Sequence, residues 1–263
     1  MKITAPPHWQ TVDFISDLHL QASEPQTLAA LAHYLEHTPA QALFILGDLF
    51  EVWVGDDALQ SPNGFEHTVA DMLHRASARL DVFIMCGNRD FLMGDRLLAA
   101  CGARALPDPS VLQLGGMRWL LTHGDAQCLA DVPYQAFRAQ VRSAAWQEDF
   151  LSQPLDQRLA LARQMRVQSE AQKKQLAQAQ TPWIDLDHGA CVALLAAQGA
   201  NHMIHGHTHQ PAQHDLGQGR MRWVLSDWDL HATPPRAEVL RLHAAGGAPQ
   251  RLTLTLTSAQ AAP

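Results

Sequence analysis

The chain has 263 residues, of which 47% are hydrophobic and 17% charged, and its formal net charge at pH 7 is -7. This composition excludes wholesale disorder and a coiled-coil rod, and the acidic balance differs from the basic field of a general nucleic-acid binder. The sequence has no CxxC pair, no signal-peptide pattern and no stretch apolar enough to span a bilayer, so we expect a reduced, cytoplasmic protein with one large domain over 1–263.

Short apolar runs typical of strands alternate with helical patterns along the chain. Strands are expected at 12–15, 43–46, 82–85, 119–121, 202–204 and 223–225, with two more at 237–242 and 251–257. Helical periodicity covers 26–35, 63–77, 95–101 and 187–198. This alternation predicts a layered α/β fold.

Residues 131–181 interrupt the alternation. They contain no glycine and no strand-like run, and Asp131 and Pro133 are helix-start signals, so we expect an all-helical insertion. Trp146 and Phe150 fit a core better than a membrane anchor. The arginines of the insertion fit a solvated helix face at least as well as a phosphate site (Arg138, Arg142, Arg158 and Arg163).

Polar residues follow directly after six of the expected strands. Loops beyond the carboxyl ends of strands converge on one crevice in α/β sheets, so these segments can meet there. Strand alternation would put Asp17 and His19, two residues apart, on one side. The candidate metal ligands are Asp17, His19, Asp48, Asn88, His123, His207 and His209.

The type and number of these donors suit two divalent cations, with a carboxylate such as Asp48 bridging them. Oxygen and imidazole donors without thiolate favour Mn, Fe, Co, Ni or Zn over calcium. We take Mn²⁺ as the first choice among these ions.

Five ordered motifs between Phe14 and His209 carry a family resemblance: Asp-x-His, Gly-Asp, Gly-Asn-x-Asp, His and Gly-His-x-His. In this order they resemble the signature of the calcineurin-like metallophosphoesterases. The resemblance implies a four-layer αββα sandwich, in which two β-sheets lie between helices. It also implies one metal held by Asp17, His19, Asp48 and His209, and a second held by Asp48, Asn88, His123 and His207.

Arg89 stands where this family usually has a histidine that protonates the leaving group. An arginine does not release a proton at neutral pH, but its planar fork suits phosphate oxygens. We therefore expect a leaving group that needs no acid. With the helical insertion, this departure is similar to the family members that split the diphosphate of the lipidated sugar nucleotide UDP-2,3-diacylglucosamine, in lipid A biosynthesis, into UMP and 2,3-diacylglucosamine 1-phosphate.

The resemblance also implies roles for individual residues. A hydroxide bridging the two metals would attack phosphorus, and the insertion would form a lid over the substrate. The catalytic candidates are Asn88, Arg89 and His123, and the substrate-binding candidates are Asn88, Arg89, Asp131, Ser169, Lys173 and His207. The chain departs from the expected lid pattern at Leu176, where a lysine would be anticipated, which leaves the register around 169–180 open.

Other polar residues near these motifs have two readings. Asp90 and Asp125 are expected to orient ligand histidines. His205 lies outside the Gly-His-x-His core, so a structural role fits it as well as a site role. Asp56 and Asp57 either shape the loop after Asp48 or form a solvated turn.

Three other functions remain open at this point. A phosphatase or phosphodiesterase for soluble nucleotides or phosphoproteins should have histidine at position 89, a non-catalytic scaffold should have lost ligands, and a nuclease should carry a basic track. A lipid substrate further implies peripheral contact with the cytoplasmic face of the inner membrane, for which Trp146, Phe150 and Leu151 beside arginines would be suited. We expect no nucleic-acid partner and no obligate protein partner.

Overall fold

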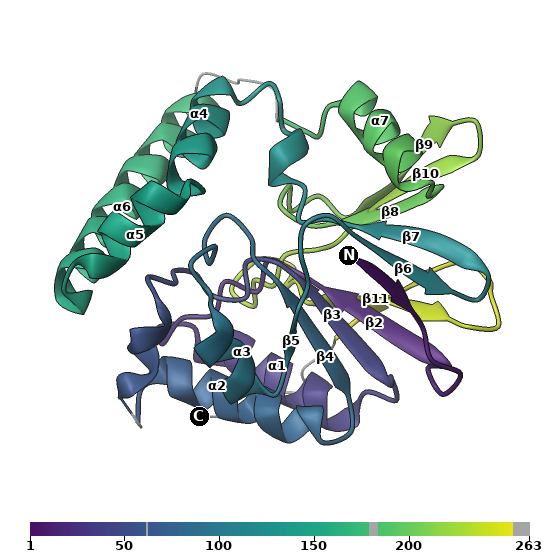
Figure 1. Cartoon of the computed structure of the whole chain (residues 1–263), viewed down its shortest axis with the longest axis horizontal. Coiled ribbons are helices and arrows are strands. Elements are labelled where there is room, and N and C mark those ends of the chain that lie inside the picture. The colour runs from purple at the N-terminus through teal and green to yellow at the C-terminus, as the bar shows by residue number, and fades with distance from the viewer. Residues whose placement is uncertain (62, 179–183, 255–263) are drawn as a thin grey trace.

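The computed structural model describes residues 1–61, 63–178 and 184–254, and for 168–178 it describes the helical backbone without the side chains. Two six-stranded sheets form the centre of this part of the chain (Figure 1). The first has the order β12 (Gln250–Thr253), β11 (Glu238–His243), β2 (Thr11–Ile15), β3 (Ala42–Leu46), β4 (Asp81–Met85), β5 (Arg104–Ala105). The second has the order β1 (Lys2–Thr4), β6 (Ser110–Leu114), β7 (Met117–Leu121), β8 (His202–His205), β10 (Arg220–Val224), β9 (Ala212–Gly217).

Helices cover the outer faces of both sheets, which gives the expected four-layer αββα arrangement (Figure 1). The first sheet is covered by α1 (Pro25–His37), α2 (Phe65–Ser77) and α3 (Asp95–Cys101), and the second by α7 (His188–Gln198). Every residue of β3 is buried, because helices cover one face of this strand and the second sheet covers the other.

The core between the sheets is rich in aromatic residues. The rings of Phe44 and Phe83, on neighbouring strands, stack with centroids 4.7 Å apart, and Phe14 stacks on Phe44 at 5.3 Å. Trp119 and Ile204 meet this cluster from the second sheet. Such packing holds the two sheets in a fixed relation, which in turn fixes the loops at their edges.

Parallel pairing brings the predicted site loops to one edge. Strands β2, β3 and β4 run parallel in the first sheet, and β7, β8 and β10 run parallel in the second. Their carboxyl ends therefore lie on the same side of each sheet, as the sequence predicted.

The strands that the sequence pattern missed are β1, β5, β6 and β9. Strand β9 reads AQHDLG and has a largely exposed, polar surface, so it carries no apolar run. Strand β5 has only two residues. The last predicted strand, 251–257, is β12 up to Thr253, and its residues 255–257 lie outside the described part of the chain.

The insertion is helical through residue 178, and its last residues 179–181 lie outside the described part. It folds as α4 (Val132–Val141), α5 (Ala144–Ser152) and α6 (Leu155–Gln178), which project beside the sheets in Figure 1 and are called the lid below. Trp146 stacks on Phe150 at 4.7 Å and lies beside Phe91. Phe150 belongs to the core that covers the first sheet and Trp146 packs against that core, so the core interpretation of these two residues is confirmed. Within the described residues, no helix has the length and apolar character needed to cross a bilayer.

Candidate metal centre

All seven predicted ligands lie in the loops at the carboxyl ends of β2, β3, β4, β7 and β8. Most of them have a left-handed backbone: φ is 54° at Asp17, 49° at His19, 54° at Asp48, 69° at His207 and 55° at His209. This conformation is costly for residues with a Cβ, and it gathers at functional sites where the surroundings enforce it. The one further non-glycine residue with positive φ in the described chain is Gln218, in a turn.

The left-handed bends replace the strand alternation that we expected for Asp17 and His19. Strand β2 ends at Ile15, before either residue. The amide of Asp17 donates to the carbonyl of Gly47 at 3.1 Å, and the amide of His19 donates to the carbonyl of Asp48 at 3.0 Å. These backbone bonds bind the loop after β2 to the loop after β3, and the bends turn both side chains toward the same space.

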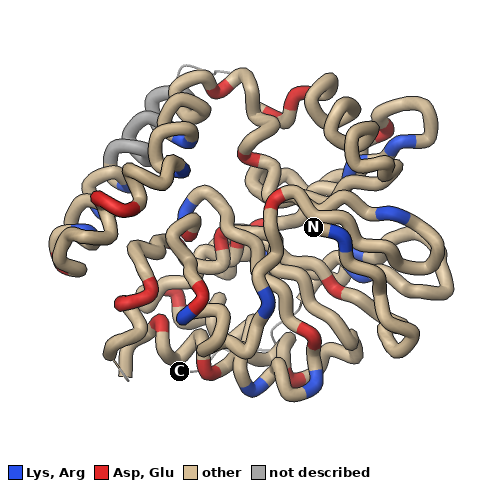
Figure 2. Tube along the Cα trace, viewed as in Figure 1, with Lys and Arg blue, Asp and Glu red and all other residues tan. Residues whose placement is uncertain are grey.

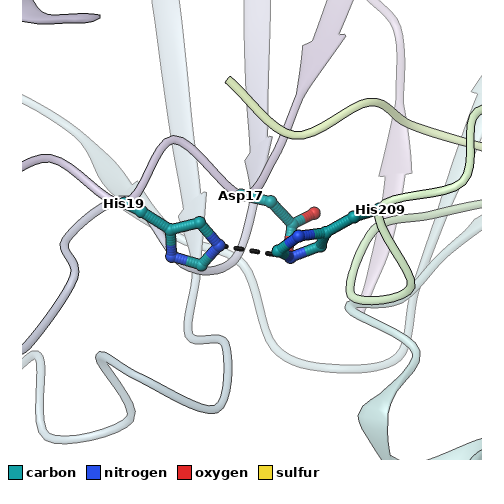
Figure 3. A group of neighbouring side chains, drawn as sticks. All are labelled: Asp17, His19 and His209. Atoms are coloured by element: carbon teal, nitrogen blue, oxygen red, sulfur yellow. Dashed lines mark hydrogen bonds and ion pairs between the residues drawn. The ribbon is translucent and has the colours of Figure 1, made fainter. Parts of the chain in front are cut away.

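The first group of candidate ligands consists of Asp17, His19 and His209 (Figure 3). The Nε2 atoms of the two imidazoles face each other at 3.2 Å, and Nε2 of His209 lies 3.3 Å from Oδ1 of Asp17. One ligand atom from each residue lies within 4.8 Å of the other two. Two imidazole nitrogens and a carboxylate oxygen converging in this way fit a divalent cation.

The second group consists of Asp48, Asn88, His123 and His207. Oδ1 of Asn88 lies 2.9 Å from Nε2 of His123 and 2.8 Å from Nδ1 of His207. Asp48 lies between the two groups, with Oδ1 at 3.8 Å from Nε2 of His123 and Oδ2 at 4.0 Å from Nδ1 of His19. This position suits the bridging role that the sequence suggested for Asp48.

Two glycines permit the close approach of these loops. A Cβ at Gly87 would lie 2.0 Å from Oδ1 of Asp48, and a Cβ at Gly206 would lie 2.3 Å from Oδ2 of Asp17. Both distances are impossible for real atoms, so larger residues would displace the ligand carboxylates. The glycines of the Gly-Asn and Gly-His motifs are thus required by packing at the site.

The pKa values of the ligands reflect their burial and their crowding. Burial and the nearby carboxylates of Asp90 and Asp17 raise the pKa of Asp48 to about 7. Burial opposes a charge on His123, but the carboxylates around it raise its pKa to about 9. Burial also lowers the pKa of His207 to about 3. Buried carboxylates and imidazoles in direct contact form a donor set that a cation stabilises.

The partners of the candidate ligand histidines are not the expected Asp90 and Asp125. Nδ1 of His123 pairs with the carbonyl of Leu46 at 2.9 Å, and Nδ1 of His209 faces Oδ2 of Asp227 at 3.6 Å. The Asp90 carboxylate instead accepts from backbone amides, including that of Leu49 at 2.7 Å, and so shapes the ligand loop itself. Fully buried His205 pairs through Nδ1 with the carbonyl of Gly206 at 2.8 Å.

Arg89 is held at the edge of this centre by Glu51, a residue that the sequence analysis did not select. Nη1 of Arg89 donates to Oε1 of Glu51 at 2.5 Å, and its backbone amide donates to Oδ1 of Asp48 at 2.9 Å. Arg166, on α6 of the lid, reaches the same Oε1 at 2.7 Å. Glu51 stands three residues after Asp48, and only this spacing beside a ligand motif could have indicated it.

The lid is attached to the site loops through its arginines. Nε of Arg138 donates to Oδ2 of Asp125 at 2.8 Å, and Nη2 of Arg142 donates to the carbonyl of Gly87 at 2.7 Å. Arg158 is 2% exposed and contacts Asp57 and the carbonyl of Val54. A solvated helix face is therefore wrong for these three arginines, whereas Arg163 is exposed as that interpretation requires.

Both acidic residues of the loop after Asp48 bind neighbouring segments of the chain. Asp57 pairs with Arg158, and Asp56 accepts from the amides of Gly94, Arg96 and Leu97 at 2.9–3.1 Å. The loop-shaping reading of Asp56 and Asp57 is confirmed.

The predicted substrate residues of the lid are placed as follows. Asp131 is the N-cap of α4, where its Oδ1 accepts from the amide of Tyr134 at 3.1 Å. Ser169 and Lys173 lie on α6, and their side chains are outside the part that the structure describes. In Figure 2, basic positions occur along the lid and acidic positions occur in the loops at the centre of the view.

Comparison with known proteins agrees with this geometry. The model of the calcineurin-like phosphoesterase family matches residues 10–211. The chain is 45% identical to a UDP-2,3-diacylglucosamine hydrolase of Ralstonia nicotianae, with 88% of each chain covered. It is 44% identical to a protein of the same name from Stenotrophomonas maltophilia, covering 90% of this chain and 96% of the relative. For the Bordetella pertussis protein of that name, identity is 42%, with 84% and 87% covered.

Proposed function

Because the chain belongs to the calcineurin-like phosphoesterase family, and its relatives over most of its length are UDP-2,3-diacylglucosamine hydrolases, we propose that it hydrolyses the diphosphate of UDP-2,3-diacylglucosamine. The products are UMP and 2,3-diacylglucosamine 1-phosphate. The extent of the similarity to these relatives is the observation that carries the substrate assignment. The protein is a metal-dependent hydrolase.

The residues of the candidate centre would hold two divalent ions, for which we propose Mn²⁺. Asp17, His19 and His209 form one set of donors with Asp48, which they share with a second set at Asn88, His123 and His207. When bound, the ions supply a hydroxide at neutral pH and stabilise negative charge on the phosphate. The carboxylate and amide oxygens among the donors suit Mn²⁺, and the imidazole nitrogens suit first-row metals in general, so the donor set is compatible with this choice.

Arg89 and Asn88 bind the phosphate in this proposal. Arg89 is 9% exposed at its side chain and lies beside Asp48, so its guanidinium is close to the metal centre. Its fork has five N–H donors, of which the contacts with Glu51 and Asp48 use only part. It can therefore hold a phosphate oxygen, and it donates no proton because it stays charged. A phosphate monoester leaves without an acid, which is consistent with this residue.

The lid binds the lipidated part of the substrate in this proposal. Apolar side chains are exposed in and just before the lid, at Leu129, Val132, Leu151, Leu161 and Val167. Exposed apolar groups beside arginines favour contact with acyl chains and with an anionic lipid surface. For this reason we propose that the protein lies at the cytoplasmic face of the inner membrane. We also propose that Asp131, Ser169, Lys173 and His207 contact the substrate.

The experiment that tests the function is release of UMP from UDP-2,3-diacylglucosamine in detergent, with Mn²⁺ or with a chelator. Bis(p-nitrophenyl) phosphate serves as the control substrate. Release that depends on Mn²⁺ and exceeds hydrolysis of the aryl diester is expected. Hydrolysis of the aryl diester alone would support the metal centre but contradict the lipid substrate.

A further inference from the structure

Glu51 joins three parts of the molecule at one carboxylate. Its Oε1 accepts a hydrogen bond from Arg89 at 2.5 Å and forms an ion pair with Nη2 of Arg166 of the lid at 2.7 Å, and its Oε2 lies 3.5 Å from Nδ1 of His19. Its own backbone amide donates to the carbonyl of Leu20 at 3.1 Å, in the loop that carries His19. This bond holds the backbone of Glu51 against the loop that carries His19.

The two guanidinium groups need a negative charge between them. Arg89 and Arg166 contact the same oxygen atom, and their side chains are 9% and 24% exposed. Like charges this close repel each other where solvent screening is limited, and a long arginine side chain loses rotamer freedom when it is held. The carboxylate of Glu51, 19% exposed, offsets the repulsion and fixes the Arg89 fork beside Asp48.

The contact with His19 has a separate consequence. Nε2 of His19 points toward His209 and the first metal group (Figure 3). A carboxylate at the opposite ring nitrogen fixes the ring and makes the facing nitrogen a better ligand, which is a common arrangement around bound metals. Oε2 of Glu51 lies 3.5 Å from Nδ1 of His19, a buried nitrogen without a hydrogen-bond partner among the described residues, so Glu51 is the carboxylate placed to take this role.

We propose that Glu51 is a positioning residue that aims Arg89 at the phosphate, orients His19 toward its metal and ties both to Arg166 of the lid. This inference rests on the proposed function for the phosphate role of Arg89. It concerns a residue that touches no reacting atom and acts through its three partners. A phosphate that reaches Arg89 meets a fork already held in place.

The test uses Glu51→Gln, which keeps the shape of the side chain and removes its charge. We expect kcat/KM for the lipid substrate to fall by about tenfold or more. Arg89→Lys keeps a positive charge, so its activity remains measurable, but it lacks the planar fork. If Glu51 acts through Arg89, the effect of Glu51→Gln shrinks to about threefold or less in the Arg89→Lys background.

Metal affinity gives a readout that requires no substrate. Mn²⁺ is titrated into the metal-depleted protein and the unbound ion is followed by its paramagnetic resonance signal. Glu51→Gln should weaken one of the two binding events by about tenfold. Asp71→Asn, an exposed residue of α2, is the matched control and should change neither measurement. Thermal melting identifies any variant that loses activity through unfolding.

The outcomes separate the two roles from each other and from the proposed function. Fully additive losses in the two variants would overturn the role toward Arg89, and an unchanged Mn²⁺ affinity would overturn the role toward His19. If the wild-type protein releases no UMP, the proposed function fails, while the Mn²⁺ titration and the same variants on bis(p-nitrophenyl) phosphate still decide the role of Glu51.

Discussion

Oδ2 of Asp125 accepts a hydrogen bond from the hydroxyl of Tyr134 at 2.6 Å. Asp125 follows the candidate ligand His123 by two residues, in η2 (Asp125–Gln127), and Tyr134 lies in the first helix of the lid. The bond therefore joins the metal loop to the lid directly. Arg138 reinforces it from the next turn of the same helix.

Tyr134→Phe should loosen the lid while leaving the core folded. A hydrogen bond to a charged group contributes about 1.5–3 kcal/mol, so the local opening of α4 becomes easier by that amount. Hydrogen exchange of the amides of residues 132–141 measures this opening. Tyr34→Phe is the matched control, because its hydroxyl bonds to Asp13 inside the core and far from α4. Unchanged exchange in the Tyr134 variant would show that this hydrogen bond does not hold α4 in place.

Asp48→Ala and Arg89→Ala should separate metal binding from phosphate binding. Loss of Asp48 removes the carboxylate between the two ligand groups, so both bound Mn²⁺ and turnover are lost. Loss of Arg89 should leave the metal content intact and lower kcat by about 10²–10³-fold, as for other preorganised donors. Elemental analysis of the purified variants and UMP release give the two readouts. Equal metal loss in both variants would be evidence against this division of roles.

Metal removal should lower the thermal stability of the wild-type protein. A ligand that binds only the folded state at 100 times its dissociation constant stabilises it by about 2.7 kcal/mol. A melting curve with Mn²⁺ should therefore shift upward relative to one with a chelator. The shift should become smaller in His209→Ala if His209 is a ligand, because the donors of the second group remain. A full shift in that variant would remove His209 from the set.

Asp13→Ala should destabilise the fold without touching the site. The fully buried carboxylate of Asp13 is bound by Arg241 at 2.7 and 2.8 Å, and also by Tyr34 and Thr38. Removing one partner of a buried ion pair typically costs about 3–5 kcal/mol. Urea unfolding measures the change in free energy. Asp71→Ala, at an exposed pair, should stay within about 0.5 kcal/mol.

Val132→Asp should weaken binding to anionic vesicles. Val132 is 68% exposed at the start of the lid, and a negative charge there opposes insertion among acidic headgroups. Co-sedimentation with vesicles that contain phosphatidylglycerol measures the bound fraction. Gln147→Asp, on α5, introduces the same charge at a residue outside the exposed apolar set and is the control. An equal loss in both variants would indicate a general charge effect and argue against a lipid-facing lid.

The sequence by itself determined the strands at the centre of both sheets and the seven candidate ligands. Central strands such as 43–46 are buried on both faces, so their apolar runs are visible without a structure. Each ligand stands just after such a run, and chain direction in a parallel sheet carries these residues to one edge. The order of these motifs along the chain was therefore enough to predict that the seven side chains meet at one edge of the sheets.

Tertiary structure decided the edge strands and the partners of the ligands. Strand β9 is polar and forms only because β10 offers a pairing partner. Glu51 meets Arg89 across 38 residues of sequence, and His209 meets Asp227 from a different loop. Such contacts depend on where two folded loops come together, so the spacing of residues within either loop does not predict them. The bends at Asp17 and His19 have the same origin, because a left-handed backbone is held there by the loops around it.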